Sequence, residues 1–308
     1  RYYPRSSRFT NPLERLADEI WADHTNGSKL LDAMGSDHVR QKLDLMPYDA
    51  ECLFCIWPYF ERGSERTYSV RPDECLLRGS DDSHKRTSVN NLFTAGFRNG
   101  RSLPIRPCGQ FVNTIDLLQY PTEDLETLTA TAQKWIDESG LSEDNIIGRA
   151  KYIESRFNTE QFAYSLEGQP RDMSIDPIED FIKNNPQGHC EYFATALALM
   201  LRSQGIPARV VIGYKGGMYN TLGNFYQFRQ LDAHSWVEAY VPKDRIGNNI
   251  YGNADNELWE TGAWLRLDPT PGYDPNMLGR MAENMTSWNE WFNFAWENYI
   301  TRIDTNRQ

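Results

Sequence analysis

The spacing of the apolar residues changes once in the second half of the chain, and this change constrains the fold more than any other feature. Between Pro121 and Gly205 apolar residues recur at helical spacing, and between Ala208 and Asp268 they alternate as in strands. Helices followed by strands, without a βαβ rhythm, favour an α+β fold with an antiparallel sheet. We therefore expect a domain over residues 116–275 in which helices pack on an antiparallel sheet.

Several runs carry each of the two patterns. The helical runs are TEDLETLTATAQKWIDESG, which closes at Gly140, then EDNIIGRAKYIESRF, the short DPIEDFIKNN and EYFATALALMLRSQG. The strand runs are ARVVIGYKGG, FYQFRQ, AHSWVEAYV and AWLRLDP, which are rich in β-branched and aromatic residues. The stretch GYKGGMYNTLGNFYQFRQ is either a hairpin loop or a mobile loop over a cleft.

The first 115 residues have a different texture. Asn11 and Pro12 open a helical pattern, and we expect a small helix pair before residue 50. Short strand-like runs follow, separated by Gly, Pro, Ser and Asp: CLFCIWPYF, RTYSV, ECLLR and NLFTAGF. We predict an accessory helix and β-rich module over residues 1–115.

Charge and hydropathy exclude two classes of function. The formal net charge is −11, and no basic run offers a surface for phosphates, so nucleic acid is excluded as a partner. The longest apolar stretch, ATALALML, is far shorter than the ~18–20 residues needed to span a bilayer. Because the chain starts at Arg1 without a leader pattern, we expect a processed chain or a piece of a longer one.

Four of the five cysteines lie in the first 110 residues: Cys52, Cys55, Cys75 and Cys108. Their spacing suits zinc or two disulfides but is diagnostic of neither, so unlinked thiols, disulfides and a metal site stay open. No carboxylate cluster has the spacing of a calcium loop, and we predict neither a metal nor a cofactor.

The fifth cysteine, Cys190, stands where a turn gives way to a helix. Pro186 and Gly188 interrupt any helix before it, and the good helix formers after it extend to Gly205. The thiol should therefore lie at the positive end of the helix dipole, which lowers a thiol pKa and favours the reactive thiolate. Taken alone, however, such a residue is more often a structural cysteine than a nucleophile.

Two downstream residues favour the nucleophile. His234 lies in a strand pattern that places it opposite a small aliphatic face, and Asp268 ends the strand pattern that Pro269 terminates. In a Cys-His-Asp set the carboxylate fixes the imidazole tautomer, the imidazole takes the thiol proton, and the thiolate attacks a carbonyl. His189 is a less favoured base than His234, because adjacent residues at a helix start point in different directions.

The motifs GHCEYFATALALMLRSQGIPARVVIGY, DAHSWVEAYV and WLRLDPTPG together resemble the transglutaminase-like superfamily, whose core is papain-like. The resemblance covers roughly residues 116–275 and is strongest to the bacterial membrane-anchored, TgpA-like branch. DPIEDFI, GQPRD and ENYITRIDTNRQ share this likeness. In that branch a soluble domain lies outside the cytoplasm between transmembrane helices.

The resemblance implies a catalytic triad of Cys190, His234 and Asp268 that transfers acyl groups from glutamine amides of proteins or peptides to an amine acceptor. It further implies an extracytoplasmic soluble domain of a bacterial inner-membrane protein, anchored by spans outside this chain. The candidate oxyanion donors are the main-chain N–H of Cys190 and the side chain of Gln187. Further cleft candidates are Tyr214, Asp232 and Trp236.

Two alternatives and one segment remain open. A cysteine protease or amidase would use the same triad with water as the acceptor, and a non-catalytic module would bind the cell envelope. The stretch MTSWNEWFNFAWENYI carries an aromatic stripe at helical spacing. It is either a helix packed on the domain or, as the resemblance implies for residues 276–308, an amphipathic juxtamembrane tail.

Overall fold

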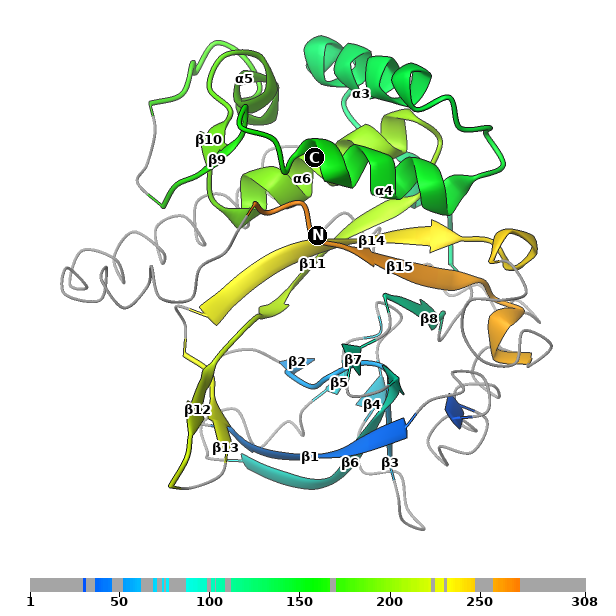
Figure 1. Cartoon of the computed structure of the whole chain (residues 1–308), viewed down its shortest axis with the longest axis vertical. Helices are drawn as coiled ribbons and strands as arrows, with labels where there is room; N and C mark the ends of the chain where they lie inside the picture. The colour runs from blue at the N-terminus through cyan, green and yellow to red at the C-terminus, as the bar shows by residue number, and fades with distance from the viewer. Residues whose placement is uncertain are drawn as a thin grey trace.

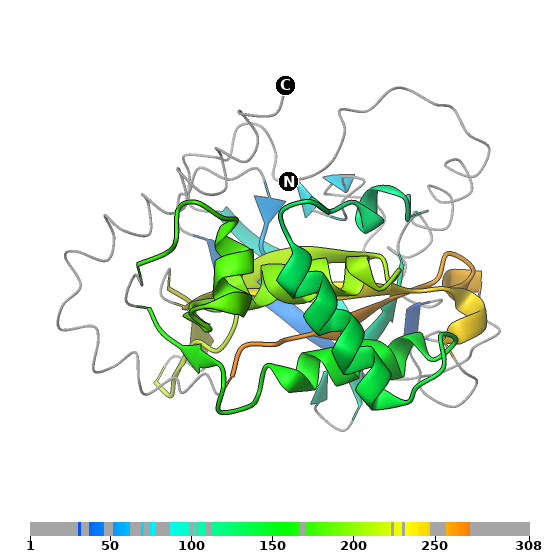
Figure 2. The same cartoon turned by 90° about the horizontal axis from the view of Figure 1, so that it is seen from above.

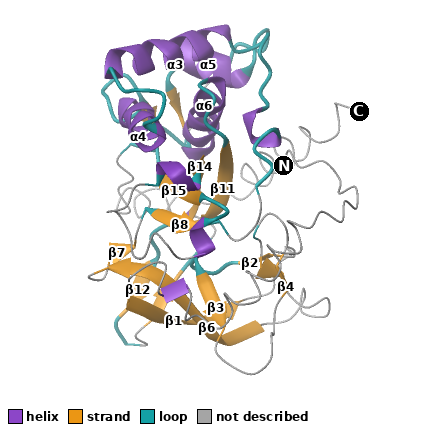
Figure 3. Ribbon diagram, turned by 90° about the vertical axis from the view of Figure 1, so that its right-hand side faces the viewer, coloured by secondary structure: helices purple, strands orange, loops and turns teal. Residues whose placement is uncertain are grey.

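The computed structural model describes residues 112–271 almost completely and the N-terminal part in pieces. In Figure 1 the helices lie on one side of a central sheet and a second sheet lies on the other, and Figure 2 shows the helices from above. Figure 3 shows the same order of layers from the side. The described residues are 30–31, 37–45, 52–61, 69–70, 74, 76–77, 87–98, 101–102, 104–108, 112–166, 170–222, 225–229, 232–246 and 257–271.

The central sheet is antiparallel throughout, as expected. Its strand order is β11-β14-β15-β8, with a full register of seven pairs between β11 and β14. One strand, β8, comes from the predicted accessory region and pairs with β15. The strands are β8 (Ile105–Pro107), β11 (Ala208–Tyr214), β14 (Ala233–Val241) and β15 (Ala263–Leu267).

The helical runs of the sequence form helices with recognisable ends. Gly140 follows the first at φ 63°, a left-handed conformation that glycine adopts without strain. Asn145 and Asp176 cap the next two, because their side chains accept main-chain N–H groups of Gly148 and Ile178. The helices are α3 (Glu126–Ser139), α4 (Ile146–Arg156), α5 (Pro177–Lys183) and α6 (Cys190–Ser203).

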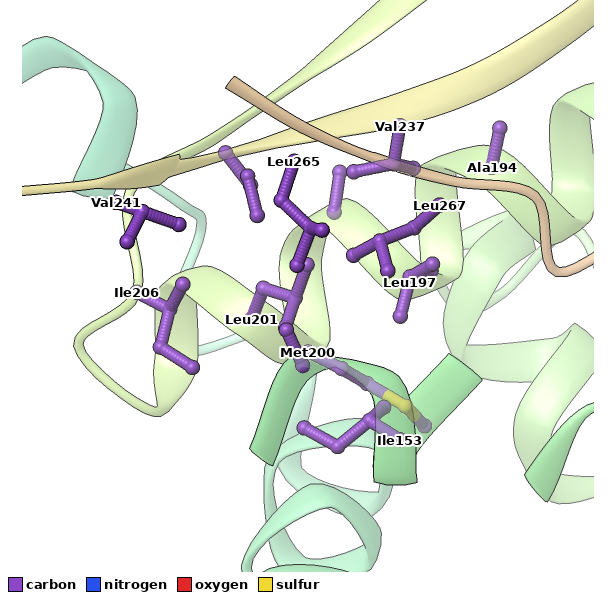
Figure 4. Packing of buried hydrophobic residues seen from close by; sticks show 14 of the residues in the cluster. Ile153, Ala194, Leu197, Met200, Leu201, Ile206, Val237, Val241, Leu265 and Leu267 are labelled. Atoms are coloured by element: carbon purple, nitrogen blue, oxygen red, sulfur yellow. The ribbon is translucent and has the colours of Figure 1, made fainter. Parts of the chain in front are cut away.

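The core between α6 and the sheet is apolar (Figure 4). Leu197 and Leu201 of α6 are fully buried, and Val237 of β14 and Leu265 of β15 are buried with them. Each such side chain contributes about 1.5–3 kcal/mol when it leaves water. This packing fixes the axis of α6 over β14, and it therefore fixes where the first residue of α6, Cys190, lies.

The N-terminal part is β-rich, as predicted, but one strand was not foreseen. Residues 37–45 form a strand where we expected a helix pair, and the pattern at residues 11–20 lies outside the described residues. One sheet has the order β1-β6-β3 with β7 on β6, and a smaller one has the order β2-β5-β4. The strands are β1 (Asp37–Leu45), β2 (Cys52–Leu53), β3 (Tyr59–Glu61), β4 (Ser69–Val70), β5 (Leu76–Leu77), β6 (Thr87–Arg98) and β7 (Arg101–Ser102).

A buried cluster of four charged side chains, here the ionic cluster, joins the N-terminal part to the central sheet. Glu74 contacts Arg106 at 2.8 Å and also pairs with Arg209. Glu238 of β14 contacts Arg106 at 3.0 Å and Arg209 at 2.7 Å. The guanidinium of Arg209 also stacks over the ring of Trp264 at 3.8 Å. Each buried charge thus has an opposite partner, which a buried ion requires.

Short elements complete the structure. A parallel pair links the segment before α6 to the segment after α4, and a hairpin follows β11. These strands are β9 (Ala163–Tyr164), β10 (Gln187–Gly188), β12 (Met218–Asn220) and β13 (Phe225–Gln227). Three 3-10 turns lie at η1 (Asp116–Leu118), η3 (Lys243–Arg245) and η4 (Glu257–Trp259).

The cysteines divide into two states. Cys52 is disulfide-bonded, whereas Cys55, Cys108 and Cys190 are free thiols. Within the described ranges no three His, Cys, Asp or Glu side chains gather as metal ligands would. None of the helices in the described ranges has the length and apolar character to cross a membrane. The predicted juxtamembrane tail, 276–308, lies outside the described residues.

Candidate active site

Cys190 is the first residue of α6, as the sequence predicted. The preceding residue, His189, is extended with φ −93° and ψ 178°, so the helix can begin only after it. The main-chain N–H groups of the first helical turn have no partner within the helix and point toward its N-terminal end. Cys190, a partly exposed residue, thus lies at the positive end of a 14-residue helix.

The thiol lies against Ser235 of β14, the residue next to His234. Protein atoms surround the thiol and raise its pKa, and this burial outweighs the hydroxyl and main chain of Ser235, which lower it. The charges of Glu191 and Asp268 raise the pKa further. The expectation of a lowered pKa for Cys190 is therefore wrong, because burial outweighs the contacts with Ser235 that lower it. The resting group is the thiol.

The contact between Cys190 and Ser235 is a weak one. The Ser235 hydroxyl is buried and reaches no partner at hydrogen-bond distance within the described part of the chain. Ser235 shares the face of β14 that packs toward α6 with Val237 and Ala239. It is therefore the one hydroxyl on an otherwise apolar described face of β14, directly beside the candidate nucleophile.

His234 and Asp268 meet across two neighbouring strands. The Nε2 atom of His234 lies 3.0 Å from Oδ2 and 3.1 Å from Oδ1 of Asp268. His234 is 3% exposed, and Asp268 directly follows Leu267, which pairs with Val237. The antiparallel register of β14 and β15 therefore brings the imidazole and the carboxylate together from positions far apart in the sequence.

Asp268 has three further contacts that hold it. Its Oδ2 atom lies 2.5 Å from Nζ of Lys215, and its main-chain N–H donates to Oε1 of Glu154 at 2.5 Å. The main-chain N–H of Thr270 donates to Oδ1 at 3.3 Å. Burial alone would raise the pKa of Asp268, but His234 and Lys215 outweigh it and hold the pKa well below its usual range. The carboxylate is therefore ionised at neutral pH.

Sequence reasoning missed both Lys215 and Glu154. Lys215 ends the strand run that leads into the Gly-rich loop, and Glu154 lies on α4, which the sequence marked only as a helix. Burial raises the pKa of Glu154, while the N–H of Asp268 lowers it. Nothing in the sequence distinguishes Glu154 from other carboxylates on helix surfaces. It becomes a neighbour of Asp268 only through the tertiary packing of α4 on β15.

Gln187, the predicted oxyanion donor, lies in the short strand β10, and Arg171 holds this segment in place. Arg171 Nη1 donates to the carbonyl of Asn185 at 2.6 Å, and Nη2 donates to the carbonyl of Gln187. The guanidinium also stacks over Tyr192 at 4.4 Å and pairs with Asp180 at 3.4 Å. The segment before Cys190 is thus fixed through its main-chain carbonyls, and the Gln187 side chain stays a candidate donor.

Trp236 lies beside His234 on the same face of β14. Their ring centroids are 6.4 Å apart with an angle of 25°, and the guanidinium of Arg266 covers the indole at 4.7 Å. A side chain at Gly213, which pairs with His234, would come within 2.7 Å of the indole. The absence of a side chain at Gly213 therefore makes room for the ring that packs next to the imidazole.

The other two cleft candidates flank Lys215 rather than contact the triad in any described interaction. The ring of Tyr214 meets Phe54 of the N-terminal part edge-on at 4.8 Å, and burial raises its pKa. Asp232 is buried, and its carboxylate accepts the main-chain N–H of Arg229 at 2.7 Å. Its carbonyl accepts the N–H of Lys215 at 2.9 Å. Both residues therefore support the segment that carries Lys215.

His189 differs from His234 in its surroundings. Burial lowers the pKa of His189 to about 4, and the charge of Arg171 adds to this effect. Its ring packs on Tyr192 with centroids 5.1 Å apart, and Nδ1 lies 3.9 Å from Glu191, beyond hydrogen-bond distance. His189 is therefore a neutral packing residue at neutral pH.

Part of the chain is similar in sequence to known bacterial proteins. A protein-glutamine gamma-glutamyltransferase from Pseudomonas aeruginosa is 40% identical over 128 residues, which are 42% of this chain and 16% of that protein. YebA of Bacillus subtilis, an uncharacterized protein, is 31% identical over 136 residues, again 42% of this chain and 16% of the relative. This chain thus matches about a sixth of the length of these curated relatives.

The structural likeness extends further along the chain than the sequence likeness. The periplasmic domain of TgpA from Pseudomonas aeruginosa, bound to ethylmercury, has a TM-score of 0.56 and 27% identity, covering 76% of this chain and 72% of that one. The family model of the transglutaminase-like superfamily matches residues 134–269, from α3 to just beyond β15. The helices on an antiparallel sheet and the cysteine at the start of α6 agree with that match. Residues 134–269 are therefore a transglutaminase-like domain.

Proposed function

We propose that this chain transfers acyl groups from glutamine amides to amines, with Cys190 as the nucleophile, His234 as the base and Asp268 as the residue that orients the base. The observation that carries the proposal is the contact of His234 Nε2 with Asp268. A carboxylate at Nε2 favours the tautomer that keeps its proton there and has its lone pair on Nδ1. The same carboxylate stabilises the imidazolium that forms when Nδ1 takes a proton.

The raised pKa of Cys190 suits a thiol that is activated only when substrate is bound. Nδ1 of His234 takes the thiol proton, and the sulfur attacks the carboxamide carbon of glutamine. The C–N bond then breaks, the imidazolium returns its proton to the leaving nitrogen, and ammonia departs. A primary amine attacks the thioester, His234 takes the proton of the amine, and the sulfur leaves and is reprotonated.

The oxyanion of each tetrahedral intermediate needs hydrogen-bond donors at the sulfur. The main-chain N–H of Cys190 is at the start of α6, where such groups are not used by the helix. Gln187 is the second donor in this proposal, because Arg171 fixes its main chain three residues before α6 begins. Trp236 beside His234 would limit the access of water to the thioester.

We place the chain outside the cytoplasm of a bacterium, as the soluble part of an inner-membrane protein that is anchored by spans beyond this chain. The likeness to a periplasmic domain supports this placement. The disulfide bond at Cys52 supports it independently, because such bonds persist in oxidising compartments. In this proposal residues 116–275 are the catalytic domain, and residues 1–115 are an accessory module that the ionic cluster ties to it.

The test is an incorporation assay with a glutamine-containing peptide and a labelled primary amine. Wild-type chain should form labelled peptide and release ammonia, whereas Cys190→Ala should lose at least ~10³-fold in rate, because no nucleophile remains. His234→Ala should lose about 10²–10⁴-fold, the usual contribution of a general base.

The products separate the remaining functions. Ammonia release without incorporation of the amine would replace the transferase by an amidase, and cleavage of the peptide backbone would replace it by a cysteine protease. If neither reaction occurs and Cys190→Ala leaves binding to cell-envelope material unchanged, the chain is a binding module.

A further inference from the structure

Two residues outside the proposed triad hold Asp268 from opposite sides. Lys215 Nζ contacts the carboxylate at 2.5 Å, through the same Oδ2 atom that lies 3.0 Å from His234. Glu154 accepts the main-chain N–H of Asp268 at 2.5 Å. The contact with Lys215 holds the side chain of Asp268, and the contact with Glu154 holds its backbone.

The chain brings these two residues to Asp268 from separate elements. Lys215 follows the last residue of β11, and its own N–H donates to the carbonyl of Asp232 at 2.9 Å. Gly216 and Gly217 follow at φ 92° and 96°, conformations that turn the chain away into the hairpin β12–β13. Lys215 is therefore anchored at a strand end, and Glu154 is anchored on α4.

The charges that face Asp268 come from four elements. Lys215 from the end of β11 is a cation, Glu154 from α4 is a carboxylate, and His234 from β14 gains charge during the reaction. Cys190 from α6 gains negative charge when it loses its proton. Lys151 of α4 acts on Glu154 rather than on Asp268. Lys215 is thus the permanent cation on Asp268 among these described groups.

We propose that Lys215 and Glu154 are positioning residues of the triad, which together hold the carboxylate of Asp268 at His234 Nε2 and set the pH below which the imidazole stops acting as a base. This inference rests on the proposed function and adds two residues to its machinery. Lys215 and the imidazolium share one carboxylate oxygen, so the ammonium makes protonation of His234 less favourable. Replacing Lys215 by a neutral residue should therefore move the acidic limb of the activity to higher pH.

The size of the effect is limited by solvent. The side chain of Lys215 is 36% exposed, so its charge is partly screened. A shift of about 0.5 to 1 pH unit is expected when this charge is removed, at the lower end of what a neighbouring charge produces. Glu154 acts instead by holding the backbone of Asp268 in place. Glutamine at position 154 should keep the side-chain oxygen that accepts the N–H of Asp268.

The first measurement titrates His234 by NMR in the full chain with Cys190→Ala, so that the thiol does not titrate together with the imidazole. In Lys215→Met the midpoint should rise by about 0.5 to 1 pH unit, and in Lys215→Arg it should stay within about 0.2 unit of the parent. Lys134→Met, which removes a 73% exposed lysine, is the control. His234→Gln assigns the resonance. A midpoint unchanged in Lys215→Met, or moved as far in Lys215→Arg, would overturn the role of Lys215.

The second measurement uses the amine-incorporation assay with Cys190 intact. The acidic limb of kcat/KM should move to higher pH in Lys215→Met by the same amount as the NMR midpoint. Glu154→Ala should lower kcat about 10-fold with little change in KM, because the carboxylate is displaced from the imidazole, and Glu154→Gln should recover most of that loss. Equal losses in Glu154→Ala and Glu154→Gln would overturn the role of Glu154.

The two measurements separate this inference from the proposed function. If no acyl transfer is found, the function fails, and the NMR titration still decides whether Lys215 acts on His234. Thermal unfolding of each variant shows whether it folds. If Lys215→Met does not fold, Lys215→Gln takes its place in the titration. This variant removes the same charge but keeps a polar end group.

Discussion

On one face of β14, Val237, Ala239 and Val241 pack in the apolar core with α6, and on the other face Glu238 lies in the ionic cluster. Both faces are buried, yet they are stabilised differently. The apolar face tolerates imprecise contacts because dispersion is not directional, whereas a buried charge requires a matched partner. The apolar face therefore fixes the position of Cys190, and the charged face makes the sheet dependent on the N-terminal part.

The largest effect should come from breaking the charged face. Glu238→Ala removes one of the two carboxylates that pair with the buried guanidiniums of Arg106 and Arg209 in the described residues, and it should cost about 3–5 kcal/mol in free energy of unfolding. Urea denaturation checks this value. Glu260→Ala, which removes a half-exposed pair with Lys243, should cost below about 1 kcal/mol. Similar losses in the two variants would contradict the distinction between them.

For the apolar face, the loss in free energy of unfolding should increase with the side-chain volume that is removed. Leu201→Ala leaves a cavity between α6 and the sheet and should cost about 3 kcal/mol. Leu199→Ala, on the partly buried side of α6, should cost clearly less. Because Leu201 lies far along α6 from Cys190, the activity per folded molecule should change little. A loss of activity larger than the loss of folded protein would contradict this expectation. It would show that the position of the Cys190 thiol depends on packing at Leu201.

The smallest effect concerns acid stability and the largely buried side chain of His189. Its folded pKa of about 4 lies below the ordinary 6.5, so it contributes stability that is fully present above 6.5 and is lost as the pH falls toward 4. Between pH 7.5 and pH 5 this linkage should cost about 2 kcal/mol in the wild type.

In His189→Gln that part of the pH dependence should be absent, which denaturation midpoints at the two pH values measure. Equal slopes in the two proteins would show that His189 is not the residue responsible. His189 thus differs from both faces of β14. It is an ionisable group that the folded protein accommodates because it stays neutral.

Much of the fold follows from the residue pattern, and the exception is informative. The helices α3 to α6 and the strands β11, β14 and β15 are where the periodicity predicts them. The missed strand, β1, buries the polar Gln41, whose side-chain amide exchanges hydrogen bonds with the main chain of Ile56 at 2.9 and 2.7 Å. A buried glutamine satisfied by a backbone weakens the alternation of polar and apolar residues on which strand prediction depends.

The candidate site divides in the same way. Cys190, His234 and Asp268 stand in local motifs, each at the end or start of an element, so the sequence alone identifies them as a set. The direction of the thiol pKa was predicted wrongly, because a helix dipole is visible in the sequence but the surrounding atoms are not. Lys215 and Glu154 were missed because ordinary charged residues become part of a site only through their neighbours.

By itself the sequence determined the order of helices and strands, the residue at which α6 begins, and the three residue types that acyl transfer needs. These properties depend on backbone conformation and periodicity over a few neighbouring residues. Only the tertiary structure decided that His234 contacts Asp268 through Nε2, that Lys215 and Glu154 hold that carboxylate, and that Glu238 ties the sheet to the N-terminal part. Such contacts join residues far apart in the chain, and their energies depend on burial and distance, which only packing sets.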